Sequence, residues 1–370
     1  MNVINRHWGQ LTLEDVRALL PLYDNSLAPL AIEWHSDRPF SSAAIVRTQS
    51  RPVFVKRHAA AIRTPAQLAE EHRLMSSLAS GGIPVTRVVP TVAGSTAVAQ
   101  AGWTYEVHEI GAGIDLYRHT PSWEPFTSVA HARSAGAMLG RLHRAAEGYT
   151  APARMAHVLV SKCDILRAAD PVAQVEVYRR QRPGLAAYLA ARPWQAQLHA
   201  VLRPWHAEVH PLLEVVPALW THNDWHASNL LWSADSPDAQ VSAVLDFGLA
   251  DRTNAAFDLA TAIERNAIPW LSIQAGAAAE ASLELTEALL EGYLAQRALT
   301  PAERQLVSAI LPVVHVEFAL AEVDYYAGLV HDAAYADLAY DAFLVRHAQW
   351  FSEAPGARLL DFIRKRLRHD

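Results

Sequence analysis

The sequence has almost no cysteine and no long apolar run. Cys163 is the single cysteine among 370 residues, which excludes an intrachain disulfide and a multi-cysteine metal site. No stretch reaches the uninterrupted apolar length that a membrane helix needs. Residues 1–6 lack the charged-then-apolar pattern of a secretory signal. We therefore expect a cytoplasmic protein that does not span a membrane.

Basic charge is also limited. The formal net charge is −6, which argues against a general nucleic-acid binder. Three of the 32 cationic residues are lysine and the other 29 are arginine. A lysine inside an apolar strand is therefore informative, because ammonium and guanidinium groups differ in shape and hydration. Lys56, in the apolar segment 53–56, has such a position.

The N-terminal part of the chain is predicted to be β-rich. Thr64, Pro65 and Gln67 have the pattern of a capping box with proline at the first helical position, and Gly81-Gly82 ends the helix that they begin. Strand composition occurs on both sides of this helix, at residues 30–34, 43–48, 53–57, 87–91, 96–99 and 105–108.

From about residue 120 the chain is predicted to be mainly helical. The exception is a hairpin with strands at 230–233 and 241–247. Residues 111–113, Gly-Ala-Gly, have the composition of a hinge. We therefore expect an α+β fold with an antiparallel β-lobe over residues 1–110 and a larger helical lobe over residues 111–370.

The densest group of polar residues has the composition that phosphoryl transfer requires. That reaction needs a carboxylate to orient the acceptor hydroxyl and take its proton, and oxygen ligands to hold magnesium against the phosphates of ATP. Asp224 and Asn229 have the Asp-x-x-x-x-Asn spacing of a kinase catalytic loop, and Asp246 lies at a strand end 17 residues after Asn229. The combination predicts an ATP- and Mg²⁺-dependent phosphotransferase.

Residues 219–262 resemble the aminoglycoside phosphotransferase family, which also includes choline-, homoserine- and methylthioribose-kinase-like enzymes. Residues 222–229 (His-Asn-Asp-Trp-His-Ala-Ser-Asn) are similar to the family's catalytic loop, residues 246–248 (Asp-Phe-Gly) to its metal-binding strand end, and residues 258–260 (Asp-Leu-Ala) to a motif that braces the loop. The resemblance implies a bilobal, protein-kinase-like fold. It also implies these roles: Asp224 as base, Asn229 and Asp246 as magnesium ligands, His222 and Asp258 as loop supports.

The sequence departs from this family at two points. Asn223 replaces the usual glycine of the catalytic loop, and asparagine is among the residues that best tolerate left-handed backbone geometry. The expected nucleotide loop, residues 35–42, contains no glycine. We assign its phosphate contacts to backbone amides and to the hydroxyls of Ser41 and Ser42.

Lys56 is expected to pair with the phosphates and needs a carboxylate from the following helix. Helical phase, at about 100° per residue, places Glu71 within the apolar stripe and Glu70 at its edge. A carboxylate that faces the core needs a cationic partner, and Lys56 is the predicted partner of Glu71. Glu109, next to the hinge, is included among the predicted nucleotide-binding residues.

The acceptor is predicted to be a small molecule with a hydroxyl group. Glu317 and Asp324 share an apolar stripe in a helix that begins at Pro301, and Glu264 follows the Asp258 motif. Buried carboxylates are costly unless paired. Either arginines pair with Glu317 and Asp324, or these residues and Glu264 bind a cationic acceptor such as an amino alcohol, an amino acid or an amino sugar.

Other functions are compatible with parts of the pattern. A pseudokinase that binds nucleotide as a scaffold would explain the glycine-free loop, but the intact set of Asp224, Asn229 and Asp246 disfavours it. A protein kinase needs a long activation loop, for which the segment between Asp246 and Asp258, twelve positions apart, leaves no room. A metallohydrolase would need a second His/Asp/Glu cluster, and the sequence shows none of comparable density. Nothing in the sequence indicates an oligomeric state.

Overall fold

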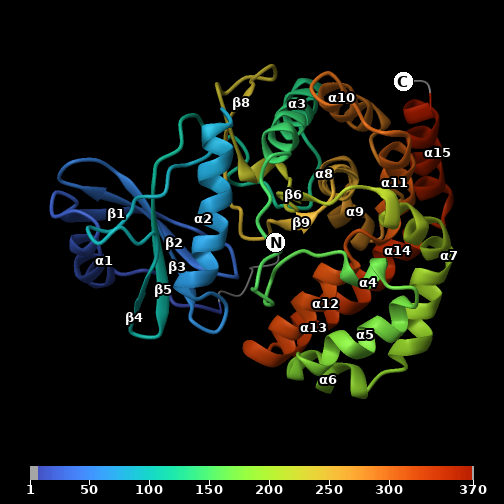
Figure 1. Ribbon diagram of the computed structural model, residues 1–370, viewed down its shortest axis with the longest axis horizontal. Coiled ribbons are helices and arrows are strands. Elements are labelled where there is room, and N and C mark those ends of the chain that lie inside the picture. The colour runs from blue at the N-terminus through green and yellow to red at the C-terminus, as the bar shows by residue number, and fades with distance from the viewer. Residues whose placement is uncertain (1–6, 369–370) are drawn as a thin grey trace. The chain divides into compact units, whose positions relative to one another are not determined.

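The protein divides into two compact units, which are described separately (Figure 1). The structure is a computed structural model and describes residues 7–368. Unit 1 consists of Met1–Ala112 and Arg154–Ala156, and unit 2 of Gly113–Ala153 and His157–Asp370. The sequence places one boundary after residue 110. The return of residues 154–156 to unit 1 has no counterpart in that prediction.

Unit 1 contains an antiparallel sheet with the strand order β1-β2-β3-β5-β4. Its elements are α1 (Leu13–Leu19), η1 (Leu20–Leu22), β1 (Pro29–His35), β2 (Ser42–Thr48), β3 (Val53–Ala59), α2 (Pro65–Ser80), β4 (Val98–Gln100) and β5 (Trp103–Glu109). The predicted strand at 87–91 is wrong: Val88 forms an isolated bridge to His108 beside β5. Pro90 has no N–H group to continue the pairing.

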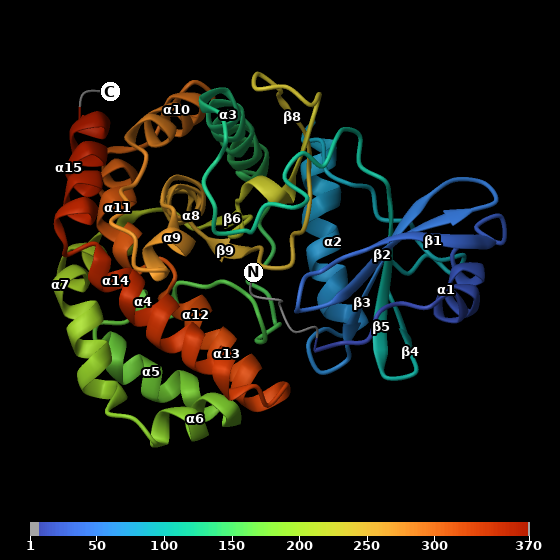
Figure 2. The ribbon, with the colours of Figure 1, turned by 180° about the vertical axis from the view of Figure 1, so that it is seen from behind.

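The two faces of this sheet have different partners. One face packs against α1 and η1, and its apolar core includes Leu19, Leu20, Val55 and Val107. Because side chains alternate along a strand, Lys56 and Glu106 lie on the opposite face, as directly paired residues of β3 and β5. Helix α2 lies along that face (Figures 1 and 2).

The capping box predicted for α2 is confirmed. The hydroxyl of Thr64 accepts from the backbone N–H of Gln67, and the side chain of Gln67 accepts from the backbone N–H of Thr64. Pro65 is the first helical residue, and Gly81 caps the C-terminus. The helical phase is also right, because Glu71 is buried and Glu70 is half-buried.

Unit 2 is mainly helical and contains two short β-pairs, β6 with β9 and β7 with β8. Its elements are α3 (Val129–Ala146), α4 (Asp164–Arg167), α5 (Pro171–Arg180), α6 (Pro183–Ala190), α7 (Trp194–Val215), β6 (Leu219–Thr221), η2 (Ala227–Asn229), β7 (Leu230–Trp232), β8 (Val241–Val244), β9 (Asp251–Thr253), α8 (Ala255–Ala267), α9 (Trp270–Gln274), α10 (Leu283–Leu294), α11 (Pro301–Ile310), η3 (Leu311–Val313), α12 (Val316–Asp324), η4 (Tyr325–Leu329), α13 (Ala333–Asp337), η5 (Leu338–Arg346), α14 (His347–Trp350) and α15 (Ala354–Arg368). The α+β fold class and the predicted hairpin are confirmed.

Helices α3 and α10 pack closely through glycines (Figure 1). A Cβ atom at Gly136 would lie 2.0 Å from the backbone oxygen of Leu289, and one at Gly292 would lie 2.0 Å from that of Arg133. A side chain at either position would force the helices apart, so glycine is required there. The close approach brings His143 of α3 into contact with Tyr293 of α10.

The helical stretch Pro301–Leu329 bears on the prediction that the chain does not span a membrane. It is long and apolar enough to span a membrane, but 94% of its most apolar window is buried inside the protein, as in a core helix. Its capping box, Thr300 with Glu303, is present as predicted. Pro312 lies in the 3₁₀ segment η3, where the α-helical pattern is interrupted, as expected of a proline inside a helix.

Candidate active site

The Asp224 loop connects β6 to β7 in unit 2, and backbone hydrogen bonds connect it to β8. The single turn η2 ends at Asn229, and the backbone N–H of Leu245 donates to the backbone oxygen of Asn229 at 2.8 Å. Asp246 follows immediately. Two of the three residues predicted to carry the chemistry therefore lie on adjacent backbone segments.

Asn223 has a left-handed backbone, with φ of +62°, a geometry that asparagine tolerates well. Its side chain is also fully used. The side-chain oxygen accepts from the hydroxyls of Thr221 at 2.8 Å and Thr253 at 3.0 Å, and its amide group donates to the backbone oxygens of Ser161 and Leu249. Asparagine therefore supplies both the backbone geometry of the usual glycine and an anchor that glycine cannot supply.

Asp258, in the first turn of α8, holds the beginning of the loop. Its two carboxylate oxygens each accept a backbone N–H, from His222 and from Asn223, both at 2.8 Å. His143 Nε2 lies 3.0 Å from the same carboxylate, and His143 Nδ1 lies 2.8 Å from the hydroxyl of Tyr293. The α3–α10 packing thus orients the aspartate that anchors the loop.

Two more side chains brace the loop. His222 Nδ1 accepts the backbone N–H of Asp224 at 3.2 Å, so its Nε2 carries the proton and donates to the backbone oxygen of Leu245 at 2.9 Å. Asn266 accepts the N–H of Ala227 and donates to the backbone oxygen of Trp225. The side chain of Asn266 is fully buried and also donates to the backbone of α8, so it supports the loop and does not face an acceptor.

Three polar side chains surround the Asp224 carboxylate. Its Oδ1 lies 2.9 Å from Arg265 Nη1, and its Oδ2 lies 3.0 Å from Asn229 Nδ2 and 3.5 Å from His226 Nε2. Burial alone would raise the pKa of Asp224, but His226 and Arg265 outweigh burial, so the pKa lies below its ordinary value. Asp224 is therefore ionised at neutral pH. The sequence analysis missed Arg265 and His226.

The donor set near Asp224 suits a hard cation. Asn229 uses its side-chain N–H₂ group for Asp224, which leaves its side-chain oxygen as the group that can face a metal. Asp246 is exposed at the end of the hairpin with φ of +51°, and its Oδ1 accepts the N–H of Gly248 at 3.2 Å. A carboxylate and an amide oxygen are ligands that Mg²⁺ accepts, so these residues fit the predicted ion.

The residues predicted to bind nucleotide all lie in unit 1. Lys56 is half-buried on β3, and Glu71 is buried on α2, where its Oε2 lies 3.2 Å from Arg154 Nη2. Sequence reasoning did not find Arg154, which returns from a distant part of the chain. The hydroxyl of Ser42 donates to the backbone oxygen of Gly9 at 2.6 Å, and Glu109 forms an ion pair with Arg51 at 2.9 Å.

Ser41 is half-buried and immediately precedes β2. It lines a small hollow of unit 1 together with His35, Ser36, Arg38 and Ser42. The hollow thus lies within the glycine-free segment that the sequence analysis assigned to phosphate contacts.

Glu317 and Asp324 bond to backbone amides, a partner that neither predicted alternative included. Glu317 accepts the N–H of Ile165 at 3.0 Å, at the beginning of α4, and Asp324 accepts the N–H of Leu185 at 2.9 Å, at the beginning of α6. Burial raises the pKa of Glu317 to about 7, and burial also raises the pKa of Asp324. The third candidate, Glu264, is buried 3.2 Å from His347 Nδ1.

Glu322 is a fourth carboxylate, which sequence reasoning did not select. It lies on α12, half-buried, within electrostatic range of Asp224, Arg265 and Glu264. Burial raises its pKa to about 8, and the charges of Asp224 and Glu264 act in the same direction. Within residues 7–368 no hydrogen bond or ion pair to its carboxylate is present.

Residues 38–302 match the phosphotransferase enzyme family. The chain belongs to that family. The family and enzyme class predicted from the catalytic loop are thus confirmed. The phosphotransferase is 27% identical over 252 residues to a homoserine kinase of Caulobacter sp. (strain K31), covering 68% of this chain and 67% of that protein. It is 25% identical over 321 residues to the homoserine kinase of Caulobacter vibrioides (strain NA1000 / CB15N), covering 85% and 88%.

A solved structure resembles the phosphotransferase over most of its length. A microcompartment-associated aminopropanol kinase matches with a TM-score of 0.59 at 17% identity, covering 94% of this chain and 100% of that chain. This similarity confirms the kinase-like fold that the sequence implied.

Proposed function

We propose that the protein transfers the γ-phosphoryl group of ATP to a hydroxyl of a small molecule that also carries an amino group. The observation that carries this proposal is the Asp224 carboxylate, held by Asn229 and Arg265 on a loop whose first residues bond to Asp258. Asp224 is ionised and remains partly exposed, with 16% of its side chain accessible. It can therefore accept a hydrogen bond, and then the proton, from an acceptor hydroxyl.

Magnesium would be held by the side-chain oxygen of Asn229 and the carboxylate of Asp246. When bound, the ion would neutralise charge on the phosphates of ATP. The contact between Asn229 Nδ2 and Asp224 Oδ2 would keep the amide oriented with its oxygen free. His222 and Asp258 would support the loop without touching either substrate.

The nucleotide-binding roles remain proposals for unit 1. Lys56 would pair with the phosphates, with Glu71 as its supporting carboxylate. The backbone amides near Ser41 and Ser42 would contact the phosphates as well. They suit this role better than the Ser42 hydroxyl, because that hydroxyl already donates to the backbone oxygen of Gly9. Glu109 completes the proposed set.

Glu322 is the best-supported carboxylate for the acceptor's amino group. Glu317, Asp324 and Glu264 each bond to a protein group. By contrast, the carboxylate of Glu322 forms no hydrogen bond or ion pair with the described residues. The Caulobacter relatives are named homoserine kinases, and the structural neighbour is an aminopropanol kinase. Both names describe an acceptor with a hydroxyl and an amine, which supports an acceptor of this class.

A panel of acceptors with ATP and Mg²⁺, scored by phosphorus NMR, tests the proposal. Homoserine and aminopropanol should be phosphorylated faster than neutral polyols of the same size. Asp224→Asn should retain ATP binding and lose turnover by roughly 10²-fold or more, the magnitude of general-base catalysis. Nucleotide-induced stabilisation with no turnover on any acceptor would indicate a nucleotide-binding scaffold instead.

The pH dependence of the Michaelis constant tests Glu322. Because its pKa is raised to about 8, the carboxyl is largely neutral at pH 6 and ionises as pH rises towards 8. The Michaelis constant for an ammonium acceptor should therefore fall over this range. In Glu322→Gln it should be higher and lose this dependence, while the constant for ATP is unchanged. The same profile in both proteins would remove Glu322 from the acceptor site.

A further inference from the structure

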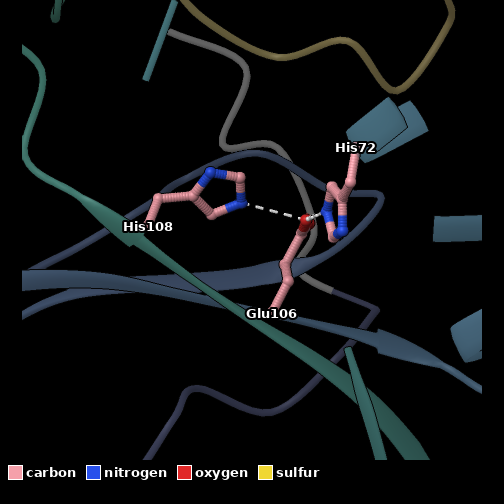
Figure 3. Close-up of side chains that lie close together, drawn as sticks. All are labelled: His72, Glu106 and His108. Carbon is pink, nitrogen blue, oxygen red and sulfur yellow. Dashed lines mark hydrogen bonds and ion pairs between the residues drawn. The ribbon is translucent and has the colours of Figure 1, made fainter. Parts of the chain in front are cut away.

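We propose that His72, Glu106 and His108 in unit 1 form a zinc-binding site, separate from the magnesium site proposed at Asp246 (Figure 3). The three side chains come from α2 and β5. Their candidate ligand atoms all lie within 4.8 Å of one another, and the three residues are buried. Among the residues that the structure describes, this is the group of three such side chains whose ligand atoms all lie that close together.

Two imidazoles point at one carboxylate oxygen. His72 Nε2 lies 2.7 Å from Glu106 Oε2, and His108 Nε2 lies 2.9 Å from the same oxygen (Figure 3). In this state each Nε2 donates its hydrogen to Glu106. The atoms that would bind a metal therefore already converge on a common point.

Only a small movement would admit the ion. Zinc lies about 2.0–2.2 Å from histidine nitrogen and carboxylate oxygen. At a tetrahedral angle, two such ligands are roughly 3.4 Å apart. The contacts of His72 and His108 with Glu106 would thus open by about half an ångström. Rotation of the imidazoles and the carboxylate can supply that distance.

The protons on the imidazoles can also move. To bind zinc, Nε2 must lose its hydrogen and Nδ1 must carry it. The Nδ1 atoms of His72 and His108 are buried and have no hydrogen-bond partner within residues 7–368, so the exchange of tautomers breaks no hydrogen bond at Nδ1. The free energy of zinc binding must outweigh the cost of the buried N–H groups that the exchange leaves unsatisfied. Two imidazoles with one carboxylate favour zinc over magnesium, which prefers oxygen ligands.

A third histidine orients the carboxylate. His58 Nε2 lies 3.0 Å from Glu106 Oε1, the oxygen that His72 and His108 do not use. A hydrogen bond to the oxygen that does not face the metal fixes the orientation of a metal-binding carboxylate and raises its affinity for the metal. The site would be closed by burial, with a fourth position left for water, and it would join α2 to the face of the sheet that carries Lys56.

Zinc titration of the full-length, chelator-treated protein tests the inference. One equivalent of Zn²⁺ should bind by calorimetry, and saturating zinc should raise Tm by roughly 5 °C or more. Co²⁺ in place of zinc should give visible absorption bands of a four- or five-coordinate site in the wild-type protein. His72→Gln and His108→Gln should each lower the affinity for zinc by at least tenfold. Mg²⁺ alone should give neither the calorimetric binding, nor the rise in Tm, nor the absorption bands.

His131→Gln is the matched control. His131 is a buried histidine of unit 2 that bonds to Tyr117 and to the backbone of Ser236, so its loss should leave zinc binding intact. Zinc bound equally by His72→Gln and the wild type would place the ion elsewhere and overturn the proposal. So would a wild-type protein without cobalt bands, a result that does not depend on the folding of any variant.

Discussion

Arg265 should help His226 to hold the pKa of Asp224 below its ordinary value. Its Nη1 lies 2.9 Å from Asp224 Oδ1, and its guanidinium stacks 3.9 Å above the ring of Trp123. At an effective dielectric constant of 20, two charges about 4 Å apart interact by roughly 4 kcal/mol. Since 1.36 kcal/mol corresponds to one pH unit, removing the arginine charge should raise the pKa of Asp224 by up to about three pH units.

The assay is the pH dependence of kcat with a saturating amino-alcohol acceptor. Asp224 must be ionised to take the proton, so activity is lost as pH falls through its pKa. In the wild type that pKa lies below the ordinary range, and Asp224 should contribute no acid limb between about pH 5 and 8. In Arg265→Met the acid limb should move upward by roughly one to three pH units, so the profiles of all three proteins are extended to the acid side of pH 5 to detect it.

Arg265→Lys is the control, because it retains a positive charge while changing the shape of the group. Its acid limb should stay near that of the wild type. Groups on the acceptor or on ATP titrate in all three proteins and cancel in the comparison. Identical acid limbs in Arg265→Met and the wild type would refute the electrostatic role of Arg265.

Two other predictions concern the packing of each unit. Glu71→Gln should raise the Michaelis constant for ATP and destabilise the protein by about 3–5 kcal/mol, because it removes the carboxylate charge that faces the buried guanidinium of Arg154. Glu70→Gln should cost only about 1 kcal/mol in chemical denaturation, and equal effects would contradict the assignment. Gly292→Ala should lower stability by roughly 1–3 kcal/mol, since its Cβ would lie 2.0 Å from a backbone oxygen. Gly148→Ala, with nothing within 4 Å, is the neutral control, and an equally neutral Gly292→Ala would refute the close packing of α3 and α10.

Local signals predicted much of the fold. The capping boxes at Thr64 and Thr300 define helix starts through contacts over three residues, and such contacts can be recognised from sequence. The segment at 87–91 has strand composition, but it forms only a bridge at Val88. Whether such a segment forms a strand depends on its tertiary pairing, which β-propensity alone does not predict.

The catalytic loop could be predicted because its residues are neighbours in sequence. Arg265 and Glu322 could not, since they reach Asp224 from α8 and α12, 41 and 98 residues further along the chain. Helical phase selected Glu317 and Asp324, which lie on the inward stripe of α12. It indicated correctly that these carboxylates lie inward, but phase does not identify the group that faces them.

Arginine was one of the two partners predicted for Glu317 and Asp324, but both of these carboxylates bond to backbone amides, and arginine pairs with other carboxylates. Glu71 pairs with Arg154 and Asp224 with Arg265. Asp258 is instead held by two backbone amides and His143. The difference has a physical basis: a backbone amide satisfies a carboxylate without a second long side chain, whose ordering costs conformational entropy. A carboxylate that lacks either kind of partner, as Glu322 does among the described residues, is therefore the one best suited to meet a charge supplied by a substrate.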